Sequence, residues 1–241
     1  MRILTMAALV AASLVVLPST GHAALAFNTG LALPAGTYFG TGNPNTNWTV
    51  ETTGAGYELG VQATRPFIGP ITPVGNVYTA STGLAPALAP RWAFSFSYSF
   101  IDLNNVVTRA DLSALNLTID DAAHSTSVTF NMLSWPGAAG FDLGPNVEHG
   151  PALATDNGQQ DNTNLGFAGV AAFFVPQASV WEANSYTFTL EAICGGAVCG
   201  GAGTSLGSVA MVVNTVPEPV SLVLFGIGAA AVGLARRRRT A

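Results

Sequence analysis

The sequence contains no lysine and few charges of either sign. Of its 241 residues only 9% are charged, and all eight basic residues are arginine. This scarcity excludes the basic surface that nucleic-acid-binding proteins need, while an apolar content of 49% excludes an intrinsically disordered chain. No heptad pattern, collagen period or internal repeat is present, so coiled coils, triple helices, propellers and solenoids are not favoured.

Cysteine is almost absent as well. The two cysteines, Cys194 and Cys199, enclose the sequence Gly-Gly-Ala-Val between two expected strands. In an exported protein this spacing favours a disulfide that closes a glycine-rich hairpin loop. A zinc site would need further soft ligands or nearby histidines, so we expect no metal and no other cofactor.

The first 23 residues have the pattern of a secretory signal peptide. Arg2 provides the positive start, residues 3–17 are apolar, and the small residues of Gly21-His22-Ala23 precede the cut that signal peptidase is expected to make before Ala24. The alternative is an uncleaved membrane helix, but the apolar run is short for a span and a cleavage site follows it. We therefore expect residues 1–23 to be removed on export.

The C-terminal residues 216–241 combine three features in a fixed order. A Val-Pro-Glu-Pro motif is followed by the uncharged residues 220–235, and these are followed by a basic tail, residues 236–241. The motif residues are Val216, Pro217, Glu218 and Pro219, and the basic residues are Arg236, Arg237, Arg238 and Arg239. Sixteen residues in a helix measure about 24 Å, which predicts one transmembrane helix with a cytoplasmic tail and an external domain. A plain membrane anchor is the alternative, against which the rigid Pro-Glu-Pro sequence argues.

Motif, span and arginine cluster together resemble the PEP-CTERM sorting signal of Gram-negative bacteria. The resemblance implies recognition by an exosortase, a membrane-embedded transpeptidase-like enzyme. It also implies a single-pass intermediate in the inner membrane and delivery to the cell surface or extracellular matrix. Because genomes with this system usually also make an exopolysaccharide, extracellular polysaccharide is a further expected partner. The resemblance covers residues 216–241 only and assigns no activity to the rest.

Residues 24–215 are expected to form one antiparallel β-sandwich of about nine strands. Alternating apolar and polar residues, separated by Gly, Pro, Asn and Asp clusters, favour short strands with one buried face. The clearest strands lie at residues 91–100, 115–119, 128–132, 186–192 and 209–213, and weaker ones at 47–53, 56–64, 75–80 and 167–175. The last strand is expected to run into Pro217 with hardly any linker.

One cluster, Asp120 to Ser125, combines carboxylates, a histidine and a hydroxyl. It falls between two expected strands, where Asp side chains commonly bind the local backbone, so we interpret it as a hairpin turn and expect no catalytic residue. The lone His149 lies in a Gly- and Pro-rich stretch and is interpreted as solvated. A secreted hydrolase that uses His124 or His149 remains the least favoured alternative.

Two further features suggest ligands. Residues 156–162 offer oxygen atoms around a glycine, as a calcium loop does, but the EF-hand spacing and its closing Glu are absent, so a polar loop is favoured. Trp48, in an Asn- and Pro-rich loop, and Trp135, at a strand end, are expected to be the more exposed tryptophans, and an exposed tryptophan can stack on a sugar, although a core or rim contact is the favoured alternative. We therefore expect an exported structural or adhesive protein without enzymatic activity, with a carbohydrate-binding module as the alternative.

Overall fold

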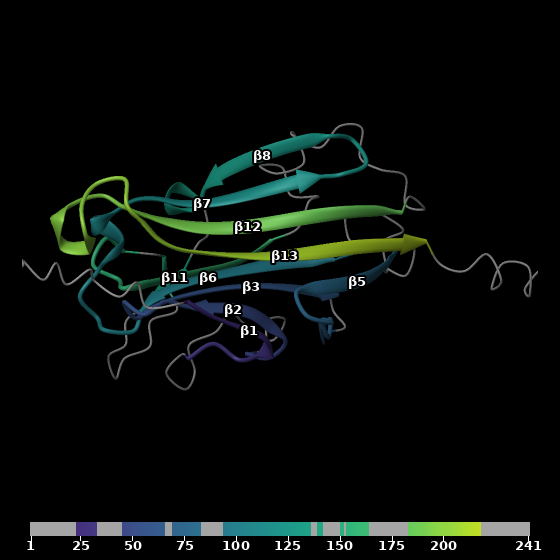
Figure 1. The fold of residues 1–241 in the computed structure, drawn as a ribbon, viewed down its shortest axis with the longest axis horizontal. Coiled ribbons are helices and arrows are strands. Elements are labelled where there is room, and N and C mark those ends of the chain that lie inside the picture. The colour runs from purple at the N-terminus through teal and green to yellow at the C-terminus, as the bar shows by residue number, and fades with distance from the viewer. Residues whose placement is uncertain are drawn as a thin grey trace, which may run out of the picture.

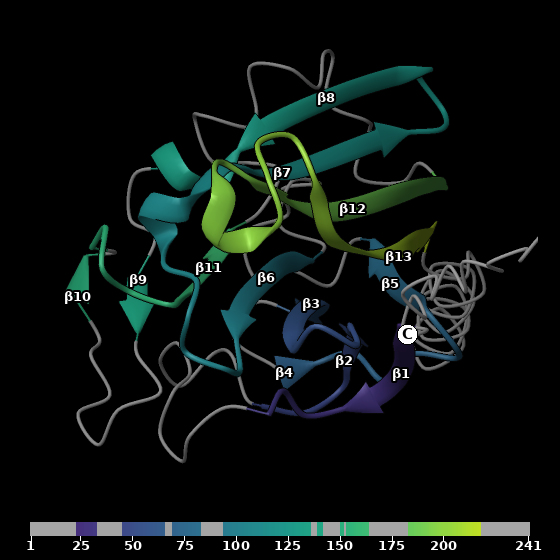
Figure 2. The ribbon, with the colours of Figure 1, turned by 60° about the vertical axis from the view of Figure 1, so that its left-hand side comes forward.

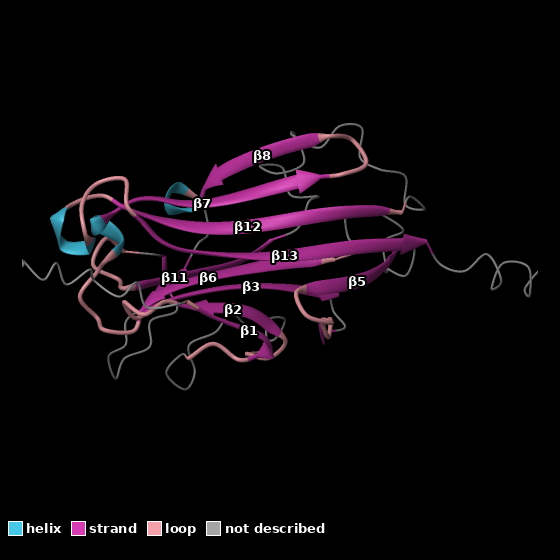
Figure 3. Cartoon of the chain, in the orientation of Figure 1, coloured by secondary structure: helices cyan, strands magenta, loops and turns pink. Residues whose placement is uncertain are grey.

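The computed structural model describes residues 23–32, 45–65, 69–82, 94–135, 139–141, 150–151, 153–163 and 183–217 (Figure 3). The expected signal peptide, the transmembrane span 220–235, the arginine tail, His149 and the strand expected at 167–175 lie outside these residues, apart from Ala23.

Strands make up nearly all of the regular structure in the described part of the chain. The strands are β1 (Ala24–Thr29), β2 (Trp48–Thr52), β3 (Tyr57–Arg65), β4 (Gly69–Pro70), β5 (Val77–Thr82), β6 (Ser95–Asp102), β7 (Leu112–Asp121), β8 (Thr126–Asn131), β9 (Ala139–Phe141), β10 (Gly150–Pro151), β11 (Gly158–Thr163), β12 (Asn184–Cys194) and β13 (Ser205–Pro217). Short 3₁₀ helices lie at Arg109–Asp111, Met132–Ser134 and Ala197–Cys199.

The strands form two sheets that lie one above the other (Figure 1). The larger sheet has the order β1-β2-β3-β6-β11-β9-β10, with β4 also paired to β3, and the smaller has the order β5-β13-β12-β7-β8. All described pairings are antiparallel except that of β5 with β13, which is parallel. The expectation of a purely antiparallel fold is therefore wrong for this edge, because β5 comes from far upstream and does not form a hairpin with β13.

One apolar core lies between the two sheets. Along β12 buried and partly exposed residues alternate strictly, as expected for a strand with one face on a core. The core includes aromatic side chains of both sheets: the rings of Phe96 in β6 and Phe188 in β12 have centroids 4.7 Å apart. The arrangement is thus a two-layered sandwich, and the alternating residues 94–100 supply four of its buried aromatic side chains, Phe94, Phe96, Tyr98 and Phe100.

A second, small apolar cluster lies on the other face of the larger sheet. It consists of Leu31, Trp48 and Val50. Gly60 of β3 makes room for it, since a Cβ atom on that residue would lie only 3.1 Å from Cε3 of Trp48. The polar face of β6 is also buried, with Ser97 and Ser99 fully covered. The larger sheet is therefore covered on both faces around its centre.

Candidate functional site

The C-terminal end of β13 is where the folded domain meets the Val-Pro-Glu-Pro motif. On one side β13 pairs with β12, where the last pair is Asn184 with Thr215. On the other side it pairs in parallel with β5, and this ladder continues to the pairs Val216 with Ser81 and Pro217 with Thr82. The first two motif residues thus belong to the sheet, which confirms the expectation that the last strand runs into Pro217.

Thr215 is fixed at this end by hydrogen bonds to the start of β12. The Asn184 backbone N–H donates to the Thr215 hydroxyl over 3.0 Å, and that hydroxyl lies 3.3 Å from the Asn184 carbonyl, which accepts from it. Thr215 is 7% exposed and Asn184 8%. Buried hydrogen bonds of this kind are costly to leave unmade, so they hold the strand end in place.

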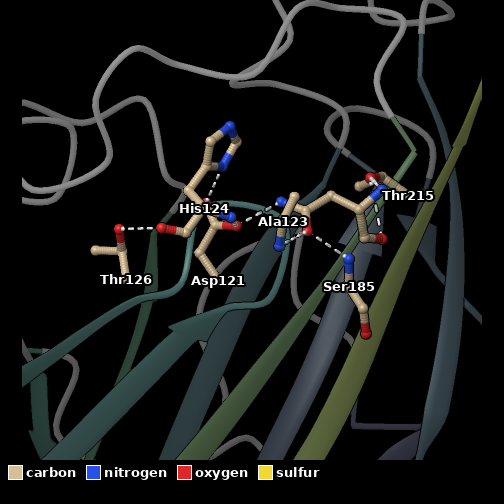
Figure 4. Close-up of polar contacts among 7 residues, drawn as sticks. Asp121, Ala123, His124, Thr126, Ser185 and Thr215 are labelled. Carbon is tan, nitrogen blue, oxygen red and sulfur yellow. Dashed lines mark hydrogen bonds and ion pairs between the residues drawn. The ribbon is translucent and has the colours of Figure 1, made fainter.

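The Asn184 side chain links this strand end to the turn between β7 and β8 (Figure 4). Its Nδ2 donates to Oδ1 of Asp121 over 2.8 Å, and its Oδ1 accepts from the backbone N–H groups of Ala123 (3.0 Å) and Ser185 (2.7 Å). Residue 184 therefore joins three strands, β7, β12 and β13, at one end of the smaller sheet. We call the hydrogen-bonded group of Asp121, Asn184 and Thr215 the junction network.

Asp121 and His124 close the hairpin turn, as predicted for the Asp120–Ser125 cluster. Asp121 is 4% exposed, and its Oδ2 lies 2.9 Å from His124 Nδ1 while its Oδ1 accepts the His124 backbone N–H over 3.1 Å. The imidazole points away from the sheet, and the Thr126 hydroxyl donates to the His124 carbonyl (Figure 4). The carboxylate thus organises both the backbone and the imidazole of the turn, as Asp side chains commonly do in turns.

The predicted disulfide is present at the opposite end of the same strands. The Sγ atoms of Cys194 and Cys199 are 2.05 Å apart, and the bond spans the connection between β12 and β13. The connection contains the 3₁₀ helix Ala197–Cys199, drawn at the far left in Figure 1 and nearest the viewer in Figure 2. This bond lies away from the junction network, which is at the other end of the sheet.

The expectation that Trp48 is an exposed loop residue is wrong. It begins strand β2 and is 1% exposed, because Leu31 from a distant segment packs in the same cluster. Trp135 is partly buried at the end of the Met132–Ser134 helix, and its ring meets Phe130 edge-on with centroids 5.6 Å apart. Of the two proposed sugar-stacking residues, only Trp135 retains an exposed surface.

The stretch from Asp156 to Asn162 is not the polar loop that was expected. Its second part is strand β11, and the polar side chains are buried against β6: Gln159 Nε2 donates to the Tyr98 hydroxyl (2.9 Å) and Gln160 Nε2 to Ser99 Oγ (3.0 Å). Burial raises the pKa of the Asp161 carboxyl to about 6, although the Asn162 N–H partly offsets this. Among the described residues, no group of three or more His, Cys, Asp or Glu side chains is placed to hold a metal ion.

Glu218, Pro219 and Arg236 to Arg239 lie outside the described residues, so their expected roles stay predictions. Within the part of the chain that the structure describes, we find no helix with the length and apolar character of a membrane span.

A comparison with protein-family models identifies a PEP-CTERM protein-sorting motif at residues 215–239. No curated protein and no solved structure matches the chain. The matched segment begins at Thr215, the residue held by the junction network, and includes the whole Val-Pro-Glu-Pro motif. The chain is therefore a PEP-CTERM sorting domain-containing protein, and its motif implies processing by an exosortase and export toward the cell surface.

Proposed function

We propose that the sandwich is a non-enzymatic structural or adhesive domain of the cell surface or extracellular matrix. It crosses the inner membrane with a signal peptide that is cut before Ala24, and it is held there by residues 220–235 until an exosortase acts. The observation that carries the proposal is the sorting motif at residues 215–239, directly continuous with a folded domain.

Two features of the domain support this proposal. Strand β1 begins at Ala24, the first residue of the expected mature chain, so the first described strand starts where the signal peptide would end. In addition, the Asp121–His124 pair, the cluster most similar to a catalytic one, makes hydrogen bonds that organise the hairpin turn. These hydrogen bonds give the Asp121–His124 pair a structural role in the turn.

The test replaces Glu218 by Ala in the full chain. If an exosortase recognises this carboxylate, the variant should accumulate in the inner membrane fraction and be depleted from the cell surface. Glu218→Gln keeps the shape of the side chain but removes its charge, so it shows which of the two the exosortase recognises. Asp120→Ala, which removes an acidic residue on the outer face of β7, is the control. Surface delivery of Glu218→Ala at the wild-type level would contradict the proposal.

A carbohydrate-binding module is the second candidate, and the partly exposed Trp135 is the observation that favours it. Its edge-on contact with Phe130 fixes the ring, and a fixed aromatic surface is suited to stacking on a sugar. Binding on a glycan array should then be lost in Trp135→Ala and retained in Trp48→Phe, which alters a buried residue. Equal binding by Trp135→Ala would remove this assignment.

A further inference from the structure

The sorting motif begins inside a β-ladder. Val212 to Pro217 of β13 pair residue by residue with Val77 to Thr82 of β5, and we call this parallel pairing the junction ladder. Its last two described pairs contain Val216 and Pro217, the first two residues of the motif. The backbone that leads into the processing site is therefore paired with β5.

The residues on the two sides of the junction differ in exposure. Thr215 is buried and bonded to Asn184, which is bonded in turn to the buried Asp121. Val216, the next residue, is 42% exposed and pairs with Ser81 of β5. Among the described strands, the partner strand β5 lies at an edge of its sheet. Terminal segments at sheet edges open locally at lower free energy than the core, so Thr215 marks the point from which the ladder can open.

Enzymes that bind a peptide in extended form commonly use its backbone N–H and C=O groups, which a β-ladder occupies. From this geometry we propose that β5 is a latch on the sorting motif. Val216 and Pro217 must separate from Ser81 and Thr82 before the exosortase can process the chain, while the junction network keeps the rest of β13 folded. The inference rests on the proposed exosortase processing and adds a positioning role for β5. Processing then follows the population of the locally opened junction.

A reversible cross-link tests the latch in the full chain, in membranes that contain the exosortase. The double variant Ser81→Cys/Val216→Cys joins β5 to the motif, and strands about 4.8 Å apart lie within reach of a disulfide. The matched control, Val77→Cys/Val212→Cys, cross-links the same ladder four residues earlier. We expect oxidation of the first variant to slow its processing about tenfold or more, with recovery on reduction, and oxidation of the control to change processing by less than about twofold.

The reduced form of each variant gives its own baseline, which separates the cross-link from any effect of the cysteine in the motif. Wild-type protein under the same reductant controls for the loss of the Cys194–Cys199 bond. Equal processing of the oxidised and reduced Ser81→Cys/Val216→Cys protein would overturn the latch. Failure of the wild-type chain to be processed, or unchanged processing of Glu218→Ala, would instead contradict the proposed function.

An insertion tests the same idea without cysteines. Four residues, Gly-Ser-Gly-Ser, placed between Thr215 and Val216 move the motif out of register with β5. We expect processing several-fold faster than in the wild type, whereas the same insertion between Gly201 and Ala202, in the β12–β13 connection, should leave the rate unchanged. An unchanged rate with the insertion after Thr215 would also overturn the latch.

Discussion

Buried polar side chains are the residue-scale feature that distinguishes the larger sheet. Gln159 and Gln160 of β11 are fully buried, and both bond to hydroxyls of β6. The guanidinium of Arg109 also reaches this group, since its Nε donates to Gln159 Oε1 over 2.6 Å. A polar strand can be buried in this way because each desolvated amide finds a partner.

Asp161 in this strand makes stability depend on pH. Burial raises its pKa in the folded protein to about 6, so folding favours the protonated carboxyl. This contribution is fully present below the unfolded pKa of about 4 and is lost as the pH rises through 6. Asp161→Asn should therefore raise the free energy of unfolding at pH 7 by about 1 kcal/mol, allowing for partial solvent screening, and change it little at pH 4.

Denaturant unfolding of residues 24–217 at both pH values measures this difference. Asp120→Asn, on the outer face of β7, removes the same formal charge at a partly exposed position and serves as the control. A destabilised Asp161→Asn protein at pH 7 would show that the carboxylate is favoured in the folded state, contrary to this account.

At the scale of the strands, β13 lies very close to the larger sheet at Gly207, next to a bulge. The register of β13 with β12 shifts between Ala192 and Ile193, next to Gly207. A Cβ atom on Gly207 would lie 2.8 Å from Cδ1 of Leu59 and 2.9 Å from Cγ2 of Thr53, both from the larger sheet. Gly207→Ala should therefore lower the free energy of unfolding by about 1–3 kcal/mol through overpacking.

Thermal or urea unfolding checks the Gly207 prediction. Gly196→Ala is the matched control, because a Cβ at that position meets no atom within 4 Å and the backbone there is extended. If both variants have the same unfolding midpoint as the wild type, the close approach of the sheets at Gly207 does not constrain the fold.

The connection between β12 and β13 is cross-linked, and removing the bond tests how much it contributes. The disulfide closes a loop with a sequence separation of only 5 residues, so the double variant Cys194→Ala/Cys199→Ala should lose about 2 kcal/mol of stability. Processing of the sorting motif should be unaffected, because the bond lies at the other end of the sheet. A comparison of urea midpoints with surface delivery separates the two effects, and impaired delivery at full stability would contradict this expectation.

Alternation of apolar and polar residues predicted the strands that have one face on the core, such as β7 and β12. It missed β11, because the Gly-Gln-Gln-Asp-Asn-Thr sequence carries no apolar face and is stabilised by hydrogen bonds to residues far away in sequence. It also missed the parallel pairing of β5 with β13, which depends on long-range topology. Trp48 was misplaced for the same reason, since its cover comes from Leu31 across an intervening segment.

The sorting signal and the disulfide, by contrast, could be predicted, because both are encoded by residues close together in the chain. The junction network could not. Asp121, Asn184 and Thr215 are separated by dozens of residues, and nothing in their local sequences indicates that they share hydrogen bonds.

The whole molecule is strongly acidic once its two terminal segments are set aside. Residues 24–215 contain three arginines against twelve acidic residues, a formal charge of −9, compared with −5 for the full chain. A matrix role therefore does not rest on simple charge attraction to acidic polysaccharide. Retention of residues 24–217 on an immobilised acidic polysaccharide should increase as salt screens the repulsion, over the range in which the Debye length falls to about 10 Å. Strongest retention at the lowest salt concentration would point to a local basic contact instead.

The position of β13 also sets an order of events during export. It is the last described strand along the chain, yet it lies in the interior of its sheet, between β5 and β12. A chain still emerging from the translocation machinery lacks this central strand, and neither neighbour can pair across the gap. The two sheets thus cannot be completed before residues 205–217 are available. Their completion also requires the pairing of β13 with β5, which is distant in sequence, and contacts of this kind form slowly. Folding of the domain therefore cannot be complete before residues 205–217, which include the first two residues of the sorting motif, have been made, so a chain that presents the motif already contains all the described strands.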